Sequence, residues 1–197
     1  MSDHYYTVDP TSKSSPSQTS FSYKNHLLTF QTDHGVFSKG ALDTGTKILL
    51  NHLPPLQGSI LDLGCGWGPI GISLAKAYPE LKVTMVDINQ RAVALSLANS
   101  KANHVSPTVL QGDGFSSLPS ATLFQTIITN PPIRTGKQAI YTLFEQSKSF
   151  LLPEGKLYLV IRKQQGAPSA FTFLQTVFSQ VLVLKKERGY WILCCIN

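Results

Sequence analysis

A short apolar run followed by alternating glycines constrains this chain most. Residues 60–63 form the kind of apolar run that is typical of a buried strand, and they end in Asp62-Leu63. Gly64, Gly66 and Gly68 come next, followed by a mostly apolar, helix-like stretch over residues 70–77. Glycine accepts positive φ and leaves no Cβ in a ligand's way, while a helix N-terminus attracts a negatively charged group. The pattern predicts strand, turn and helix with a ligand site; a plain tight turn is the alternative.

A second strand, predicted over residues 81–87, ends in the acid Asp87. In a doubly wound α/β fold, an acid at that point can accept hydrogen bonds from both hydroxyls of a ribose. Asp62, the glycine turn and Asp87 together therefore predict a site shaped for a nucleoside. The alternative is an α/β domain without a nucleotide, in which the acid only caps a helix.

These features resemble the S-adenosyl-L-methionine (SAM) site of class I methyltransferases. In that family the first acid and the glycine turn meet the methionine part of SAM, and the second acid binds the ribose. The resemblance implies that Asp113, after the third strand, meets the adenine amine; a turn acid is the alternative. The implied cofactor-binding residues are Asp62, Gly64, Cys65, Gly66, Gly68, Asp87, Ile88, Asp113, Gly114 and Asn130.

Predicted strands and helices alternate along most of the chain. This alternation indicates an α/β fold, a doubly wound and mostly parallel sheet with helices on both faces. Residues 186–190, between the last two strands, are too few for a parallel crossover, so the last strand must run antiparallel. The resemblance implies the same seven-stranded, Rossmann-like sheet. The predicted strands cover residues 60–63, 81–87, 108–110, 124–129, 156–162, 181–185 and 191–196, and the helices cover residues 43–53, 70–77, 89–102, 137–151 and 168–178.

A length of 197 residues predicts one domain with a sizeable core. Residues 41–197 form the predicted catalytic core, and residues 1–40 an N-terminal extension. Within the extension, residues 1–20 are polar and expected to be extended or loosely ordered, and residues 21–32 predict a β-hairpin. Asp43 or Thr44 is the expected N-cap of the first helix.

The composition gives no indication of a membrane or metal protein. No apolar run is long enough for a membrane span, and the first residues lack a signal-peptide pattern. Cys65, Cys194, Cys195 and the five histidines lack metal-ligand spacing. We therefore expect a cytoplasmic, reduced protein without metal. A net charge of +6 and a pI near 9.3 favour a polyanionic partner, although mild basicity alone is common.

The motif with chemical meaning is Asn130-Pro131-Pro132-Ile133, at the end of the fourth predicted strand. Open α/β sheets bind ligands at that edge. The two prolines remove two N–H donors, which leaves the Asn130 side-chain oxygen and the Pro131 carbonyl as acceptors for an NH2 group. The alternative is a plain turn, for which Asn-Pro is a common signal.

The motif resembles the Asn-Pro-Pro-aromatic signature of methyltransferases that act on planar NH2 groups. Ile133 stands in the aromatic place, so we expect Phe37 or Phe115 to stack on the substrate. Segments 35–38, 42–46 and 130–137, together with Tyr5-Tyr6, are similar to the small-subunit ribosomal RNA guanine-N2 methyltransferase family. Larger members carry a second, N-terminal domain, and this chain resembles their catalytic half alone.

The resemblance implies direct transfer of a methyl group from SAM to the N2 amine of a guanine in ribosomal RNA, expected to be 16S RNA. The expected partner is ribosomal RNA or the small ribosomal subunit, and the oligomeric state is left open. Asn130, Pro131, Pro132 and Ile133 are the candidate catalytic residues, and Phe37, Lys39, Arg134 and Lys137 the candidate substrate contacts. The alternatives are a protein-glutamine methyltransferase, an adenine-N6 methyltransferase, and a non-catalytic RNA-binding module with a vestigial SAM fold.

Overall fold

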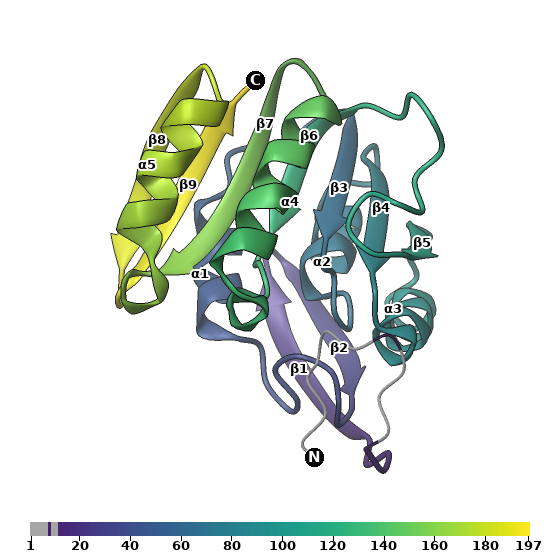
Figure 1. The fold of residues 1–197 in the computed structure, drawn as a ribbon. Coiled ribbons are helices and arrows are strands. Elements are labelled where there is room, and N and C mark those ends of the chain that lie inside the picture. Colours follow the sequence, from purple (N-terminus) through teal and green to yellow (C-terminus); the bar gives the residue numbers. More distant parts are fainter. Residues whose placement is uncertain (1–7, 9–11) are drawn as a thin grey trace.

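The fold is a central seven-stranded sheet with helices on both faces and a separate two-stranded hairpin (Figure 1). The computed structural model describes Val8 and residues 12–197. The strand order confirms the predicted doubly wound, Rossmann-like architecture. Along the sheet the strands are β5 (Thr108–Gln111), β4 (Lys82–Asp87), β3 (Ser59–Leu63), β6 (Phe124–Thr129), β7 (Leu151–Arg162), β9 (Tyr190–Ile196) and β8 (Gln180–Glu187).

Two hydrophobic cores lie on opposite faces of the sheet, because successive side chains of a strand point to opposite sides. Along β3, Ile60 joins one core and Leu61 the other; Cys194 and Cys195 divide in the same way on β9. Helices α4 (Lys137–Ser149) and α5 (Ala167–Val177) cover one face, in the foreground of Figure 1. Helices α1 (Thr44–His52), α2 (Pro69–Ala77) and α3 (Gln90–Ala102) lie on the other face.

The last strand is reversed, as predicted. The strands β3 to β7 pair in parallel, whereas β9 lies antiparallel between β7 and β8. The β8–β9 turn contains Arg188 at φ 49° and Gly189 at φ 80°. Two successive residues with positive φ match the twist of the flanking strands, which allows a tight hairpin.

Strand β7 begins earlier than predicted. The sequence predicted a helix to residue 151 and a strand from residue 156, but α4 ends at Ser149 and β7 starts at Leu151. The pairing with β6 shifts register between Phe124, opposite Leu151, and Thr126, opposite Lys156. Proline is accepted in a strand at such an irregularity, so the Pro153-containing segment interrupts the pairing without ending the strand.

The N-terminal hairpin is bonded to helix α3. Strand β1 (Ser17–Tyr23) begins before the predicted hairpin and pairs with β2 (His26–Thr32). Asn99 and Asn103 each use their side-chain amide to donate to and accept from the backbone of β2, at Gln31 and Thr29 respectively, over 2.7–3.0 Å. The side chain of Phe30 is only 1% exposed and packs edge-on against Trp67. The hairpin therefore shares the core of the α1–α3 face.

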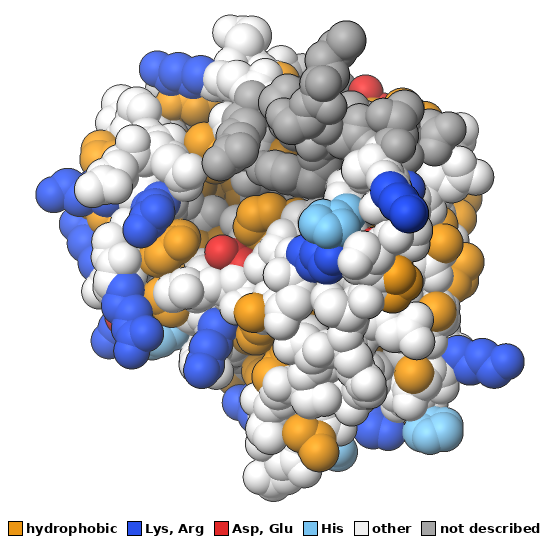
Figure 2. All heavy atoms as spheres, turned by 90° about the horizontal axis from the view of Figure 1, so that it is seen from below, with side chains coloured by type: hydrophobic (Ala, Val, Ile, Leu, Met, Phe, Trp, Pro, Cys, Tyr) orange, Lys and Arg blue, Asp and Glu red, His pale blue; other side chains and the backbone are white. Residues whose placement is uncertain are grey.

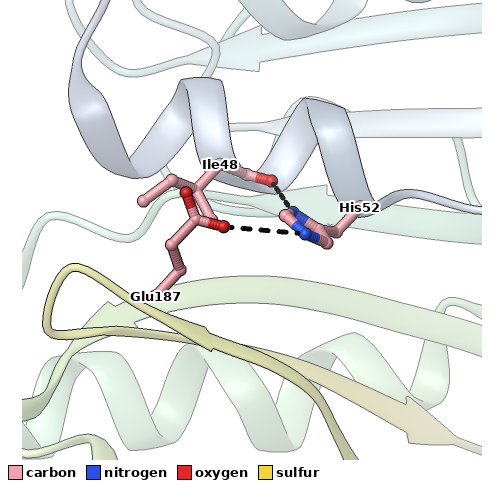
Figure 3. A network of polar contacts seen from close by, with 3 residues as sticks. All are labelled: Ile48, His52 and Glu187. Carbon is pink, nitrogen blue, oxygen red and sulfur yellow. Dashed lines mark hydrogen bonds and ion pairs between the residues drawn. The ribbon is translucent and has the colours of Figure 1, made fainter.

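Helix α1 is also connected to the far edge of the sheet. Its last residue, His52, lies 3.7 Å from the Glu187 carboxylate on β8, and its Nδ1 lies 2.8 Å from the Ile48 carbonyl oxygen (Figure 3). Asp43 is the N-cap of the helix and accepts a hydrogen bond from the Thr46 amide, as predicted. Both ends of α1 are therefore fixed.

The described residues contain no helix long and apolar enough to cross a membrane. Over the same part of the chain, no group of three His, Cys, Asp or Glu side chains is placed to hold a metal ion. All three cysteines are free and buried.

Asp62 lies beneath the turn between β3 and α2. Its side chain is 0% exposed, and Oδ2 accepts a hydrogen bond of 2.8 Å from the Gly71 amide. Oδ1 has no partner among the described residues. Burial, opposed by the Gly71 bond and reinforced by the Asp87 charge, raises the pKa of Asp62 to about 7.

This burial predicts a pH-dependent stability. The pKa of Asp62 rises from 3.8 to about 7 on folding, so the folded state binds the proton more tightly and stability falls as pH rises between these values. In Asp62→Asn the side chain cannot ionise, so this pH-dependent part of the stability should be absent. As pH rises across that range, the free energy of unfolding measured in urea should fall less for the variant than for the wild type. If the free energies of unfolding of the variant and the wild type change in parallel with pH, the prediction is wrong. Glu80→Gln, at an exposed position, serves as the control.

Candidate active site

A cavity opens at the edge of the sheet where the parallel strands end. It encloses about 690 Å³, including its open mouth, which is within the size range of small-molecule sites. Its walls come from the glycine turn, the ends of β4, β5 and β6, and the loop before α1. The lining residues are Val36, Phe37, Leu63, Gly64, Gly66, Val86, Asp87, Ile88, Ala92, Gly112, Asp113, Gly114, Asn130, Pro132 and Leu143.

The three glycines of the turn have different roles. Gly64 and Gly66 have φ of 73° and 58°, and a Cβ on either would meet nothing within 4 Å and point into open space. A Cβ on Gly68 would lie 2.6 Å from Ile72. Gly64 and Gly66 therefore keep the cavity open for a ligand, whereas Gly68 allows close packing between the turn and α2.

Asp87 connects the glycine turn to strand β4. Its Oδ2 accepts a hydrogen bond of 2.7 Å from the Gly66 amide, and its Oδ1 accepts one of 2.9 Å from the Asn89 amide. The side chain is 9% exposed, and burial raises the pKa of Asp87 despite these hydrogen bonds. Each carboxylate oxygen has a further lone pair, so Asp87 can still accept hydrogen bonds from a diol in the cavity.

Three predicted cofactor residues, Asp62, Cys65 and Gly68, are not among the described residues that line the cavity. Asp62 braces the turn from below through Gly71. The Cys65 thiol is buried 3.6 Å from the Ser96 hydroxyl, and its pKa is raised well above the usual value, chiefly by burial. A neutral, buried thiol is an inert packing group. Asp62 and Cys65 therefore support the turn from within the protein.

The remaining predicted cofactor residues are brought together. Ile88, Asp113 and Gly114 line the cavity beside Asp87, although they come from two different strand ends. The Asp113 side chain is exposed, and its own amide donates to the Ser116 hydroxyl at 3.1 Å. Asp113 thus lies in a turn and also faces the cavity. Its position is therefore compatible both with a turn acid and with a contact to the adenine amine, the two interpretations of the sequence.

A second hollow adjoins the first. It shares Val36, Phe37 and Asn130 with the first cavity, so these residues stand at the junction of the two. Phe37 is 36% exposed, and its carbonyl oxygen accepts a hydrogen bond from the Trp67 indole at 2.9 Å. The other lining residues are Ser38, Asp43, Pro131, Ile133, Arg162, Gln165 and Tyr190.

Asn130 is held in one orientation at this junction. Its Nδ2 donates to the Asp43 carboxylate and to the Thr46 hydroxyl, both at 3.0 Å. Both amide hydrogens are therefore used, and Oδ1 accepts no hydrogen bond from the described residues. Thr46 was not predicted as a site residue, and Asp43 was predicted only as a helix cap. The segment Leu42-Asp43-x-Gly45-Thr46, which is similar to the methyltransferase family, was the sequence signal that could have identified both residues.

The rest of the Asn-Pro-Pro-Ile motif lies around Asn130. The Pro131 carbonyl oxygen accepts a hydrogen bond of 2.9 Å from the Ile133 amide, so only its second lone pair remains for a ligand. Pro132 lines the first cavity and Ile133 the second. The motif thus borders both cavities.

The predicted substrate contacts are only partly assembled. Phe37 lines both cavities, but Lys39 is not among the described lining residues of either. The Lys137 ammonium lies 5.2 Å from the Tyr141 ring centroid, beside a separate hollow. Phe115 is 6% exposed and stacked on Phe150, so the expectation that it could stack on a substrate is wrong.

Two predicted features lie outside the described residues, namely Tyr5-Tyr6 and the side chain of Arg134. Conversely, Arg162 and Tyr190 line the second cavity and were not predicted. They come from β7 and β9, far from the motif in sequence. The Tyr190 ring packs against Gly45, where a Cβ would lie only 2.9 Å from it. No local pattern in the sequence indicated this contact.

Comparisons with known proteins agree with this geometry. The family described as "Methyltransferase small domain" matches residues 27–194. The structure of the T. thermophilus 16S rRNA N2 guanine methyltransferase, solved with AdoMet and guanosine, superposes with a TM-score of 0.83 and 25% identity. It covers 92% of this chain and 50% of the other.

The similar sequences include proteins of two lengths. The Bacillus subtilis protein YbxB, described as uncharacterized, is 44% identical over 98% of both chains. The ribosomal RNA small subunit methyltransferase C of Aliivibrio fischeri is 33% identical over 86% of this chain and 50% of its own length. The chain thus spans about half the length of these larger relatives. With its sheet and its glycine-lined cavity, the chain belongs to the methyltransferase small domain family, as a SAM-dependent methyltransferase.

Proposed function

We propose that the chain transfers a methyl group from SAM to the exocyclic N2 amine of a guanine in ribosomal RNA of the small subunit. The observation that carries this proposal is the Asn130 amide, whose two hydrogens are bonded within the protein. Its oxygen is left as an acceptor where the two cavities meet. The similarity to relatives named for ribosomal RNA methylation supports the choice of substrate.

The first cavity has the groups that would hold SAM. Asp87 would accept from the ribose hydroxyls, and Asp113 from the adenine amine. The space above Gly64 and Gly66 would take the methionine part, because no side chain fills it. When bound, SAM supplies an activated methyl group, so the tasks of the protein are alignment and electrostatics.

The second cavity would hold the guanine. Its walls combine apolar and aromatic groups, Val36, Phe37 and Tyr190, with the polar Ser38 and Gln165. A planar base can lie against Phe37 while its edge faces Asn130. Single-stranded or opened RNA is required, since N2 has to reach the cavity.

Asn130 would orient the attacking nitrogen. Its Oδ1 and the free lone pair of the Pro131 carbonyl accept from the guanine NH2, which aims the nitrogen lone pair at the methyl group. Positive charge develops on the nitrogen as the bond forms, and the amine proton then becomes acidic enough to leave without a strong base. The Asp43 carboxylate bonded to Nδ2 polarises the amide and strengthens Oδ1 as an acceptor.

The proposal is tested by supplying labelled SAM with small ribosomal subunits and free RNA from cells lacking this protein. Digestion to nucleosides should yield N2-methylguanosine. If the label is found in adenine N6 or in a protein glutamine, that group is the substrate and the proposed guanine is wrong. SAM binding without any transfer would favour a non-catalytic module.

The cofactor cavity gives a matched pair of variants. Gly66→Ala and Gly189→Ala both put a Cβ on a residue with positive φ and open space around it, so they should cost similar stability. Only Gly66→Ala puts that Cβ into the cavity. Calorimetric titration should show SAM affinity falling at least about tenfold for Gly66→Ala, or about 1.4 kcal/mol, and unchanged for Gly189→Ala. If Gly66→Ala and Gly189→Ala bind SAM with equal affinity, the turn is not part of the cofactor site.

Loss of the Asn130 acceptor should slow transfer more than it weakens binding. By analogy with removing one preorganised group from an oxyanion site, Asn130→Ala should lower the rate by about 10²–10³. Single-turnover methylation with saturating SAM measures this directly. If a folded Asn130→Ala variant methylates at the wild-type rate, the motif is only a turn.

The contacts behind Asn130 predict a smaller effect. Asp43→Ser can still cap α1, but its shorter side chain cannot reach Nδ2. The single-turnover rate should fall about fivefold, the equivalent of one hydrogen bond, with SAM affinity unchanged. Asp43→Asn is the comparison and should be slowed less, because both bonds go to one oxygen that an asparagine amide can replace and only the charge is lost. If Asp43→Ser and Asp43→Asn are equally active, Asp43 does not position Asn130.

A further inference from the structure

The tip of the β8–β9 hairpin and the adjoining end of β7 carry a cluster of basic side chains. The five cations are Arg162, Lys163, Lys185, Lys186 and Arg188, and all are exposed. Together with Tyr190 and Trp191 they are called the basic hairpin surface. We propose that this surface docks the single-stranded RNA that flanks the target nucleotide. The inference rests on the proposed RNA substrate and says where that RNA is held.

The charge of this surface is available to a ligand. Glu187 is its acidic neighbour, and it is paired with His52 of α1 at 3.7 Å (Figure 3). Among the described residues, none of the five cations forms an ion pair with a carboxylate. In Figure 2, which looks onto the edge of the sheet where the site opens, Lys and Arg side chains gather on the side of β8 and β9. A cationic surface without carboxylate partners suits a polyanion.

The basic hairpin surface is continuous with the proposed guanine cavity. Arg162 and Tyr190, which pair across β7 and β9, line that cavity. Tyr190 also borders a further hollow with Lys186 and Arg188. A strand leaving the guanine cavity past Tyr190 would therefore meet these cations next.

Aromatic rings lie between the cations. The Lys186 ammonium is 3.8 Å from the centroid of the Trp191 ring, and the Arg162 guanidinium is 5.4 Å from that of Tyr190. Proteins that bind single-stranded nucleic acid combine cations for the backbone with rings on which bases stack. This combination favours RNA over an acidic protein as the partner.

The surface is held in place by the backbone. The Lys163 amide, at the start of the short helix η2 (Lys163–Gln165), donates to the Gly189 carbonyl at 2.7 Å. The hairpin tip and the end of β7 are therefore fixed to one another. A prearranged row of cations loses little freedom on binding.

The test compares two double variants that remove the same charge. Lys186→Gln/Arg188→Gln alters the basic hairpin surface. Lys82→Gln/Lys101→Gln alters exposed lysines at the start of β4 and in the last turn of α3. The binding of a labelled single-stranded RNA that contains the target guanine is measured over a range of salt concentrations. SAM binding and methylation of the same RNA are measured in parallel.

We expect the hairpin variant to bind RNA on the order of tenfold more weakly at physiological salt. The slope of log affinity against log salt should lessen by about 1.4, at roughly 0.7 for each lost phosphate contact on a single strand. SAM affinity and the control variant should not change. If the wild type binds and methylates RNA but the two variants have equal slopes, the docking surface is wrong and the function stands. If the wild type neither binds nor methylates this RNA or small ribosomal subunits, both fail.

Discussion

The site depends on the hydrogen bonds that fasten the glycine turn to the end of β4. The Gly64 and Cys65 amides donate to the Val86 carbonyl, and the Gly66 amide donates to the Asp87 carboxylate. These bonds hold the turn open with its bare backbone facing the cavity, while Asp62 braces it from below. Without them, the ligand surfaces of two separate strands would not form one site.

The N-terminal segment supplies the other half of the site. The β1–β2 hairpin is bonded to α3, and the Asn89 side chain donates to the Gly35 carbonyl at 2.8 Å. These contacts bring Phe37 and Asp43 over the sheet edge, opposite Asn130. The cofactor cavity and the proposed guanine cavity therefore meet between a segment before the first sheet strand and one after the fourth. In the proposed function, that arrangement would place the reacting pair at their boundary.

Much of the fold was predictable because its signals are local. Alternating strands and helices, and a final connection too short to cross the sheet, were enough for the doubly wound sheet with a reversed last strand. The start of β7 was not predictable, because Pro153 normally ends an element. Here the register shift opposite Phe124 accommodates it, and only the neighbouring strand reveals that shift.

The sequence alone determined the cofactor class and the place of the chemical motif, since Gly64, Gly66, Asp87 and Asn130 each lie at or just after the carboxyl end of a strand, at one edge of the sheet. It could not determine the roles of the residues around them. Asp62 and Cys65 have the residue types of a binding site but are buried beneath the turn. The hydrogen bonds of Asp43 and Thr46 to Asn130, and the basic hairpin surface beside Tyr190, join segments far apart in the chain. Only tertiary packing brings such groups within bonding distance, so only the folded structure decided which of them act together.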